Sequence, residues 1–422
     1  MTTGLARISQ LAKEHPDRKL QTIMHEVNAE TLKEVHKRQG RNKASGVDEV
    51  TKASYGEELD KNVDDLVKRM KQFSYRPQPV KRVYIPKDGS EKMRPLGLPA
   101  YEDKLVQGAM ADILGAIYET KFYGFSYGFR PDRDCHRALK ALDKELWNGT
   151  NWVVDADIKG FFDNVDHEWL MRFLEHDIED KNFLRYVKRF LKAGVMEEGS
   201  FINTDSGVPQ GGSISPILAN VYLHYVIDMW FAEVAERQCK GKAKMVRYAD
   251  DVVFCFEHEE EAKGFFGALK RRLGKFGLEL SEEKSKIVRF GLNAGEEAGK
   301  FDFLGFTHMM AVSRKGNPCV KRVTSPKKLK AKRQNAKQWL RRNMHVPIVN
   351  LIEKLNVKLR GHYNYYGIIG NYDAMWGFRE YVLDRLKAVL ARRGTNKGMT
   401  EKAFRHILER YPVIQPRIVH RV

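Results

Sequence analysis

Apolar residues recur at helical spacing over the first part of the chain and then begin to alternate with polar ones. Residues 1–40 predict a polar, helical N-terminal extension, and the apolar positions of residues 60–73 and 103–118 each fall on one side of a helix. Between these two helices, alternation in residues 80–86 and 93–98 flanks an Asp-Gly pair. That pattern predicts a β-hairpin.

Two further strand signals lie in the middle of the chain. The apolar run Trp152–Val154 leads into Asp157 and predicts a strand that ends on an acid. Short apolar runs at 243–246 and 252–256 flank a tight turn, which predicts a second hairpin. Between these signals, Ser215-Pro216 indicates the start of a helix, because proline fits the first helical turn.

Beyond Phe306 the chain is predicted to be helical. Helices are expected at 327–342, 348–366 and 374–393, and Ser325-Pro326 caps the first of them. Hairpins and a strand followed by a run of helices predict an α+β fold class.

The tip of the second predicted hairpin carries two adjacent carboxylates, Asp250 and Asp251. Adjacent carboxylates repel one another unless a cation lies between them, although such a pair is more often a solvated turn. Asp157 changes that interpretation, because two-metal phosphoryl transfer needs carboxylates from separate elements around ions ~3.5–4 Å apart. These three acids are therefore the predicted catalytic and Mg²⁺-binding residues.

The other acids near Asp157 are assigned structural roles. Asp155 is predicted to point to the opposite face of its strand from Asp157, as a structural residue or one behind the metal ligands. Asp163 and Asp166 are predicted turn and cap residues, because a helical pattern begins directly after Asp166.

Composition excludes several classes of protein. The chain has 422 residues, of which 42% are hydrophobic, enough to bury a core and form two or three subdomains. No apolar run approaches the roughly 18 residues of a membrane span, and no secretion signal opens the chain. The four cysteines have no paired spacing for zinc or disulfides, which fits a reducing cytoplasm.

Positive charge is concentrated in the C-terminal quarter. The whole chain has a net charge of +19, whereas residues 308–422 hold 26 Lys and Arg against 6 Asp and Glu, a net +20. Such asymmetry, in a segment that also contains aromatic residues, indicates a polyanionic partner such as nucleic acid. A shorter basic run, such as residues 327–342, could also be only a solvated helix face.

The sequence blocks around the three acids resemble, in the same order, those of bacterial group II intron reverse transcriptases and maturases. The resemblance runs from about Lys43 to the C-terminus. Its motifs are Asn42–Asp48, Tyr84–Lys87 with Arg94–Pro99, Ser126–Pro131, the Asp157 block, Gly207–Pro216, the Asp250-Asp251 hairpin, Leu278–Lys286 and Phe301–Phe306.

This resemblance implies a right-hand polymerase with fingers, a palm and a basic helical thumb. The expected division is 1–42 as N-terminal extension, 43–306 as fingers and palm, and 307–422 as an RNA-binding thumb. The implied activity is RNA-directed DNA synthesis with Mg²⁺ in the bacterial cytoplasm. The expected partners are an RNA template, a DNA primer, dNTPs and structured intron RNA, with no membrane.

The resemblance also implies roles for residues around the acids. The expected metal ligands are Asp157, Ile158, Asp250 and Asp251. Phe162 is expected to exclude a ribose 2′-hydroxyl, with Phe161 in the core, and Gln210 to contact the nucleotide or template beside glycines that allow close backbone approach. The expected nucleotide-binding residues are Lys81, Lys87, Arg94, Phe162, Gln210 and Ala249.

The basic C-terminal segment is expected to bind RNA. A cation interleaved with aromatic residues, as in 359–367, suits RNA stacking and backbone contact. Tyr365 or Tyr366 is expected to pack inside the bundle. The expected RNA-binding residues are Lys327, Lys328, Lys330, Lys332, Arg333, Arg360 and Tyr363.

Other functions remain open at this point. A domesticated relative could serve phage defence or repair without an intron, and a maturase without polymerase activity would only bind RNA. The three intact acids argue against the latter. A viral RNA polymerase is disfavoured by Phe162 and Ala249. No cysteine pattern of a C-terminal endonuclease follows the thumb, so cleavage of a second DNA strand is not expected.

Overall fold

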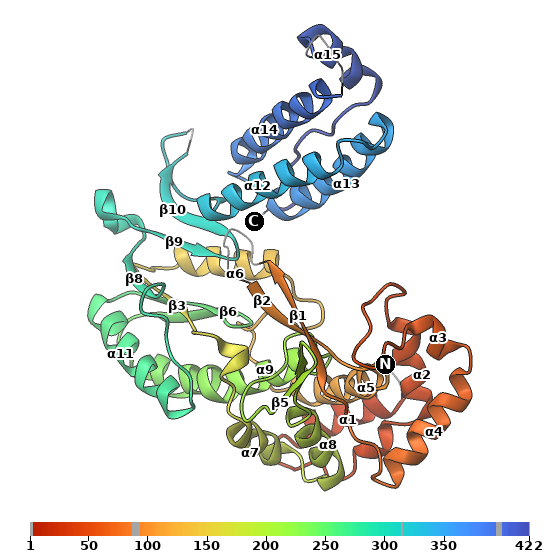
Figure 1. Cartoon of the computed structure of the whole chain (residues 1–422). Helices are drawn as coiled ribbons and strands as arrows, with labels where there is room; N and C mark the ends of the chain where they lie inside the picture. The colour runs from red at the N-terminus through yellow and green to blue at the C-terminus, as the bar shows by residue number, and fades with distance from the viewer. Residues whose placement is uncertain (1–2, 87–92, 314, 394–398, 422) are drawn as a thin grey trace.

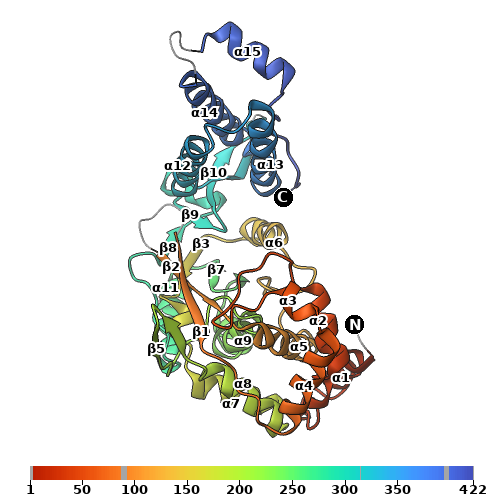
Figure 2. The same cartoon turned by 45° about the vertical axis from the view of Figure 1, so that its right-hand side comes forward.

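The computed structural model of the chain describes residues 3–86, 93–313, 315–393 and 399–421. It confirms an α+β fold, in which three sheets are combined with many helices. Figures 1 and 2 show a large lobe that holds the first three quarters of the chain. The C-terminal helices stand beside it as a second lobe.

The N-terminal helices pack on one buried helix of the large lobe. That helix, α5 (Tyr101–Tyr118), was predicted at 103–118, and α4 (Leu59–Lys71) was predicted at 60–73; both predictions are confirmed. Residues of the first forty positions, such as Ile8 and Leu32, belong to the same hydrophobic core as α5. The remaining helices of this group are α1 (Thr3–Glu14), the 3₁₀ turn Met24–Glu26, α2 (Ala29–Arg38) and α3 (Lys52–Gly56).

A four-stranded antiparallel sheet of order β6-β7-β3-β8 lies at the centre of the large lobe. It contains the predicted strand and the second predicted hairpin, both confirmed: β3 (Trp152–Asp157), β6 (Ala243–Tyr248) and β7 (Asp251–Phe256), with β8 (Lys286–Arg289) at the edge. One face packs into the main core, and the other faces α6 (Cys135–Trp147) and the second lobe. The sheet is therefore buried on both sides.

Helices cover the main-core face of this sheet. They are α7 (His167–Asp177), α8 (Lys181–Leu191), α9 (Ser215–Leu223) and α11 (Glu259–Lys275). Proline in the first turn of α9 confirms the predicted helix start. The same helix continues through two π-helical segments, His224–Asp228 and Phe231–Ala235, into α10 (Glu236–Gln238).

The first predicted hairpin is also confirmed, as β1 (Val80–Pro86) paired with β2 (Met93–Leu98). Its turn, including Lys87, lies outside the described residues. A parallel contact of β1 with β4 (Val195–Glu197), which continues to β5 (Ser200–Ile202), extends the hairpin into a second sheet. That long-range pairing was not predicted, because such short strands carry little periodicity.

No strand was predicted between Phe306 and the helix expected at 327–342. Residues 306–324 form two strands, β10 (Phe306–Val312) and β11 (Pro318–Thr324), which pair with β9 (Lys300–Phe303) in a third sheet. Tertiary contacts override the basic, weakly alternating sequence here: Phe306 is fully buried, and Arg322 forms an ion pair of 2.8 Å with Asp143 on α6. The expected boundary at 306/307 therefore falls at the first residue of β10.

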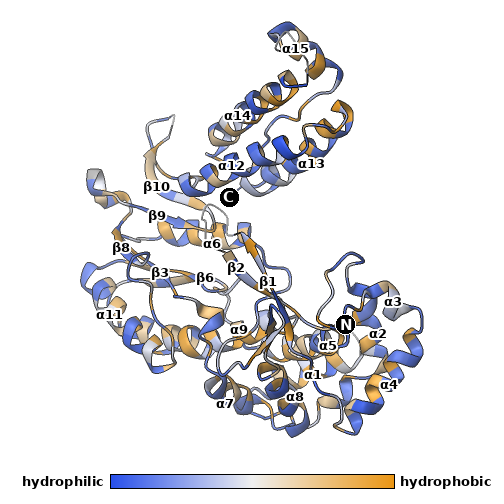
Figure 3. Ribbon diagram, viewed as in Figure 1, coloured by the Kyte–Doolittle hydropathy of each residue, from blue (hydrophilic) through white to orange (hydrophobic). Residues whose placement is uncertain are grey.

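The second lobe is a bundle of helices whose hydrophobic core continues into α6 and one face of the central sheet. Two predicted helices are confirmed as α12 (Pro326–Arg342) and α13 (Ile348–Tyr366), and the third begins two residues earlier, as α14 (Tyr372–Ala391). An unpredicted helix, α15 (Glu401–Arg410), follows. Figure 3 shows α12 as mostly hydrophilic. Across the described ranges, no helix is long and apolar enough to cross a membrane.

After α15 the chain returns toward the large lobe. Asn356 on α13 holds this returning segment through hydrogen bonds with the Pro412 carbonyl (2.9 Å) and the Ile414 amide (3.0 Å). The His420 ring then stacks on His136 of α6, with ring centroids 3.5 Å apart. The C-terminus consequently lies between the two lobes (Figure 1).

Buried His308 makes the stability of the fold depend on pH. Its ring stacks on Phe301 and neither nitrogen has a hydrogen-bond partner; burial, and secondarily Arg322, lower its pKa from 6.5 to about 3. Below pH 6.5 the unfolded chain takes up a proton that the folded chain refuses, so stability falls. Between pH 6.5 and 5.0 the loss is about 2 kcal/mol.

His308→Phe is expected to remove this loss, because a phenyl ring can keep the stack and does not titrate. Chemical denaturation at pH 7.5 and 5.0 measures it. The variant should lose about 2 kcal/mol less stability than the wild type on acidification. An equal loss in both proteins would show that other groups control the pH dependence.

Candidate active site

The three predicted acids meet at one edge of the central sheet. Asp157 ends β3 and Asp251 begins β7, and the two residues are direct cross-strand partners. Asp250 lies in the two-residue turn between β6 and β7, after Ala249, whose φ of +56° is left-handed. Three carboxylates from two elements therefore converge, as the sequence predicted.

The acids interact unfavourably with one another. Desolvation by the surrounding protein raises the pKa of Asp251 to about 6, and repulsion by Asp250 and Asp157 adds to the effect. Desolvation also raises the pKa of Asp250, with a further contribution from Asp157. Burial and mutual repulsion thus both disfavour the charged carboxylates, and a cation bound between them would relieve both effects.

Lys284 lies beside these acids and was not predicted. Its Nζ donates to Asp157 Oδ1 at 2.8 Å, and its charge also acts to lower the pKa of Asp251. Ser285 Oγ accepts a hydrogen bond from the Asp157 amide at 3.1 Å. Both residues follow Leu278–Ser281 in a motif that was recognised only as a block, so no signal in the sequence connected them with Asp157.

The prediction for Asp155 is wrong. Residues two apart in a strand point to the same face, so Asp155 lies on the same face as Asp157 rather than the opposite one. Desolvation raises the pKa of Asp155 to about 7, and Asp251 and Asp157 contribute by repulsion. Asp155 is farther from the hairpin tip, since its cross-strand partner is Val253 and not Asp251. Asp166 caps α7 as predicted, through the Trp169 amide.

The three carboxylates are suitable ligands for a divalent cation, although they are not already arranged as a complete coordination site. Within the described ranges, no three His, Cys, Asp or Glu side chains stand as a complete metal site, and Asp157 is bonded to the Lys284 ammonium. Hard carboxylate oxygens in an acidic cluster suit Mg²⁺. The Ile158 side chain is buried, so only its carbonyl can serve as a ligand. Strand alternation directs that carbonyl away from residues 279–281, on the hairpin side.

Arg94 is the predicted nucleotide-binding cation that acts on the acids directly. It lies on β2, is exposed, and its charge opposes the desolvation that raises the pKa of Asp250. Lys81 lies half-buried on β1 opposite Leu98. Lys87 is outside the described residues. Arg82, which was not singled out, lies next to Lys81 and forms an ion pair with Glu197 at 3.4 Å.

Phe162 and Gln210 line a second pocket, of about 260 Å³, which Arg82 also lines. Phe161 is 2% exposed and belongs to the core, whereas Phe162 is half-buried at the pocket wall, the arrangement expected from the sequence. The main-chain carbonyl of Gln210 accepts a hydrogen bond from the Gly97 amide at 2.6 Å.

Gly211, beside Gln210, approaches protein backbone. With φ of +118° it lies so close to β2 that an added Cβ would be 2.4 Å from the Gly97 carbonyl oxygen. From the sequence, these glycines were expected to let the backbone approach a base pair. In the structure the close neighbour of Gly211 is strand β2 of the first hairpin.

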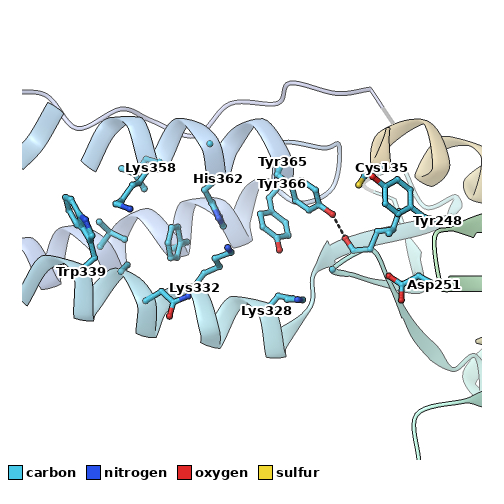
Figure 4. A pocket seen from close by; sticks show the side chains of 18 of the residues that line it. Cys135, Tyr248, Asp251, Lys328, Lys332, Trp339, Lys358, His362, Tyr365 and Tyr366 are labelled. Carbon is cyan, nitrogen blue, oxygen red and sulfur yellow. Dashed lines mark hydrogen bonds between the residues drawn. The ribbon is translucent and has the colours of Figure 1, made fainter. Parts of the chain in front are cut away.

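A groove of about 780 Å³ separates the acids from the helical lobe. Asp250 and Asp251 lie on its large-lobe side, and α12 and α13 form the opposite wall (Figure 4). Lys328 and Lys332 of α12 point into it, and Lys328 is close enough to act on the pKa of Asp251. Aromatic side chains complete the lining: Phe129, Tyr248, Trp339, Tyr365, Tyr366 and Phe378.

The predicted RNA-binding residues divide into groups with different surroundings. Lys327, Lys330 and Arg360 are exposed to solvent, whereas Lys328 and Lys332 line the groove. The Arg333 guanidinium lies over the Tyr381 ring at 5.4 Å. These six basic residues therefore do not form one continuous surface.

The prediction that Tyr363 contacts RNA is wrong. Its side chain is 2% exposed and packs in the core of the bundle, because helical spacing turns it inward with Leu359 and Tyr366. Tyr365 or Tyr366 was expected to pack inside the bundle, and Tyr366 does so. The hydroxyl of half-buried Tyr365 donates a hydrogen bond to the Leu304 carbonyl at 2.9 Å.

Two known protein families match successive parts of the chain. Residues 85–308 match the family described as "Reverse transcriptase (RNA-dependent DNA polymerase)", which contains all three acids. Residues 329–411 match the "Group II intron, maturase-specific domain", which covers most of the helical lobe.

Individual relatives show the same likeness. The chain is 34% identical over 309 residues to protein YkfC of Escherichia coli, covering 64% of this chain and 77% of that protein. It is 47% identical over 165 residues to the group II intron-encoded protein LtrA of Lactococcus lactis, covering 39% of this chain but only 27% of LtrA. A putative COX1/OXI3 intron 1 protein of Saccharomyces cerevisiae is 27% identical over 331 residues. The match covers 67% of this chain and 38% of that protein.

The two matched regions follow one another in a single chain, and the acid cluster lies in the first of them. The chain belongs to the group II intron reverse transcriptase and maturase family.

Proposed function

We propose that this protein is an RNA-directed DNA polymerase of right-hand architecture. In this proposal the β1–β2 hairpin belongs to the fingers, the central sheet to the palm, and α12–α14 to the thumb. The segments are 1–42, 43–306 and 307–422, as expected from the sequence. The observation that carries the proposal is the pairing of Asp157 with Asp251, beside Asp250, at the wall of a groove that basic helices close.

Asp157, Asp250, Asp251 and the Ile158 carbonyl would hold Mg²⁺. Bound there, Mg²⁺ activates the primer 3′-hydroxyl and neutralises the leaving pyrophosphate. Arg94 supplies positive charge next to Asp250, where a triphosphate would lie, and Lys81 adds positive charge on the same hairpin. Lys87 keeps the triphosphate-binding role that the family resemblance implies. Lys328 and Lys332 face the acids across the groove and bind the phosphates of the primer–template duplex.

Phe162 and Gln210 would select the nucleotide, and Ala249 would shape the floor beside it. The Phe162 ring stands at the wall of the second pocket, with the buried Phe161 ring packed against it at 5.3 Å. A ring supported in this way cannot move aside for a ribose 2′-hydroxyl.

Primer extension tests the polymerase proposal. A DNA primer annealed to an RNA template should be extended with dNTPs and Mg²⁺, and omission of Mg²⁺ should stop synthesis. A purified, folded protein that extends no primer on RNA would refute the proposal.

We also propose that the exposed face of the helical lobe binds structured intron RNA. Residues 308–422 hold the whole excess of positive charge, and the matched maturase-specific domain lies within them. Lys327, Lys330, Arg341 and Arg342 of α12 are exposed, and none of them is among the residues that line the groove, so they can contact RNA phosphates.

Replacing these four exposed residues of α12 with glutamine is expected to weaken the salt dependence of RNA binding. Each phosphate contact contributes about 0.7 to 0.9 to the slope of log K against log salt, so the slope should shrink by about 3 units. Filter binding of a folded group II intron RNA at several salt concentrations measures it. Extension of a saturating primer–template should change little, because the groove lysines remain.

A control variant removes the same charge elsewhere. Glutamine at Lys37, Lys61, Lys263 and Lys270, all more than half exposed on the large lobe, makes the same change in net charge. If both variants lower the slope equally, only the overall charge attracts RNA, and the assignment to α12 fails.

A further inference from the structure

A charged side chain lies completely buried behind the acid cluster. Arg247 of β6 has no exposed side-chain surface, and neither has its ion-pair partner Asp228. Arg247 Nε donates to Asp228 Oδ1 at 2.7 Å, and Nη2 donates to the other carboxylate oxygen. Burying a guanidinium is costly, and an ion pair in such a place often stabilises a protein no more than apolar residues of similar volume.

Arg247 also forms a hydrogen bond with the turn that carries the acids. Its Nη1 donates to the Ala249 carbonyl at 3.0 Å and to Asn220 Oδ1 at 3.0 Å. Ala249 is the left-handed residue of the turn and directly precedes Asp250. The guanidinium thus fixes the orientation of the peptide group that joins Ala249 to Asp250.

Gly128 confines the turn at a second place. Gly128 lies so close that an added Cβ would be 2.2 Å from the Ala249 nitrogen. Asn220, which accepts from Arg247, also donates its Nδ2 to the Gly128 carbonyl at 2.7 Å. One buried asparagine therefore connects both groups that confine Ala249.

The π-helical segment His224–Asp228 brings the two partners of Arg247 together. In an unbroken α-helix, residues eight apart such as Asn220 and Asp228 point about 80° away from each other. A π turn takes up one extra residue, which reduces that angle to about 20°. Both side chains then face Arg247 from a single helix.

We propose that Arg247, held by Asp228 and Asn220, is a positioning residue that sets the turn in the geometry in which Asp250 and Asp251 bind metal. This inference rests on the proposed polymerase function. It assigns the buried ion pair to metal affinity and turnover, and not to the stability of the fold alone.

A double variant, Arg247→Met with Asp228→Leu, separates the two roles. Apolar residues of similar volume should keep the fold, but the bond to the Ala249 carbonyl is lost. Binding of Mn²⁺ in the absence of nucleotide, followed by electron paramagnetic resonance, is expected to weaken at least fivefold. In primer extension, kcat should fall at least tenfold and the half-saturating Mg²⁺ concentration should rise, whereas KM for primer–template should change less than twofold.

Arg247→Lys is the second variant, in case the double variant does not fold. Lysine keeps the buried charge beside Asp228 but lacks the planar fork that reaches both the carboxylate and the Ala249 carbonyl. It is expected to show the same weakening of Mn²⁺ binding. The matched control is Arg69→Met with Glu102→Leu, which removes a partly buried ion pair of 2.7 Å between α4 and α5 and should leave Mn²⁺ binding unchanged.

The outcomes distinguish this inference from the function on which it rests. Wild-type Mn²⁺ affinity and Mg²⁺ dependence in a folded Arg247 variant would overturn the positioning role, even if the protein is a polymerase. A wild-type protein that binds Mn²⁺ but extends no primer would refute the proposed function, whereas weakened Mn²⁺ binding in the variants would still support the positioning role. Equal weakening in the Arg69 control would show that any lost ion pair has this effect.

Discussion

Asp251→Asn is expected to lower the rate of primer extension about a thousandfold or more, while the protein remains folded. The substitution keeps the volume of the side chain and removes the charge that would face the metal, and losses of this size follow the removal of a preorganised electrostatic contact. Its thermal stability should equal or exceed that of the wild type. Desolvation and repulsion from Asp250 and Asp157 raise the pKa of this carboxyl, so its charge is unfavourable in the metal-free fold.

Asp155→Asn is the matched control for that experiment. Asp155 has the same side chain on the same face of the sheet, but desolvation raises its pKa to about 7, so about half of this carboxyl is protonated at neutral pH. Its replacement should change extension by less than tenfold. Both variants are measured with saturating dNTPs and Mg²⁺ and by thermal melting. Near-normal extension by Asp251→Asn would end the assignment of the acids.

Phe162→Ala is expected to raise the incorporation of NTPs relative to dNTPs about 10- to 100-fold, the range that steric discrimination in a pocket provides. The ring lies half-buried at the wall of the second pocket, and its removal opens space for a 2′-hydroxyl. The ratio of kcat/KM for matched NTP and dNTP substrates measures the effect. DNA synthesis itself should fall much less than the selectivity.

Phe161→Leu provides the comparison. Phe161 is the adjacent aromatic residue and is buried in the core, so the change should lower stability by roughly 1–3 kcal/mol and leave sugar selectivity unchanged. If Phe162→Ala melts at a lower temperature with an unchanged selectivity ratio, Phe162 is a core residue too. The second pocket would then have no part in sugar selection.

Local patterns predicted the elements that carry their own periodicity. The hairpins at 80–98 and 243–256 and the helices α12 and α13 are long enough for apolar spacing to define them. Strands β10 and β11 escaped prediction, because Lys321 and Arg322 obscure the alternation and distant contacts bury Phe306 and Arg322. Residues 307–326 were consequently left without a predicted element.

The acids could be found from the sequence, because each stands at the end of an apolar run that indicates its place. The residues that surround them could not. Lys284 reaches Asp157 from 127 positions away, and Arg247 meets Asp228 only through a π turn that has no sequence signature. Tyr363 was misassigned although the sequence held the signal, because its spacing from Leu359 and Tyr366 places it on the apolar side of α13.

The returning C-terminal segment has a mechanical consequence for the groove. The helical lobe leaves the large lobe through the β9–β11 sheet, and it touches that lobe again where His420 stacks on His136. His136 also bonds the Tyr365 carbonyl through Nε2 at 2.8 Å, and Asp143 on the same helix pairs with Arg322 of β11. Helix α6 is therefore the base on which the helical lobe rests, and any change in the width of the groove has to strain these contacts.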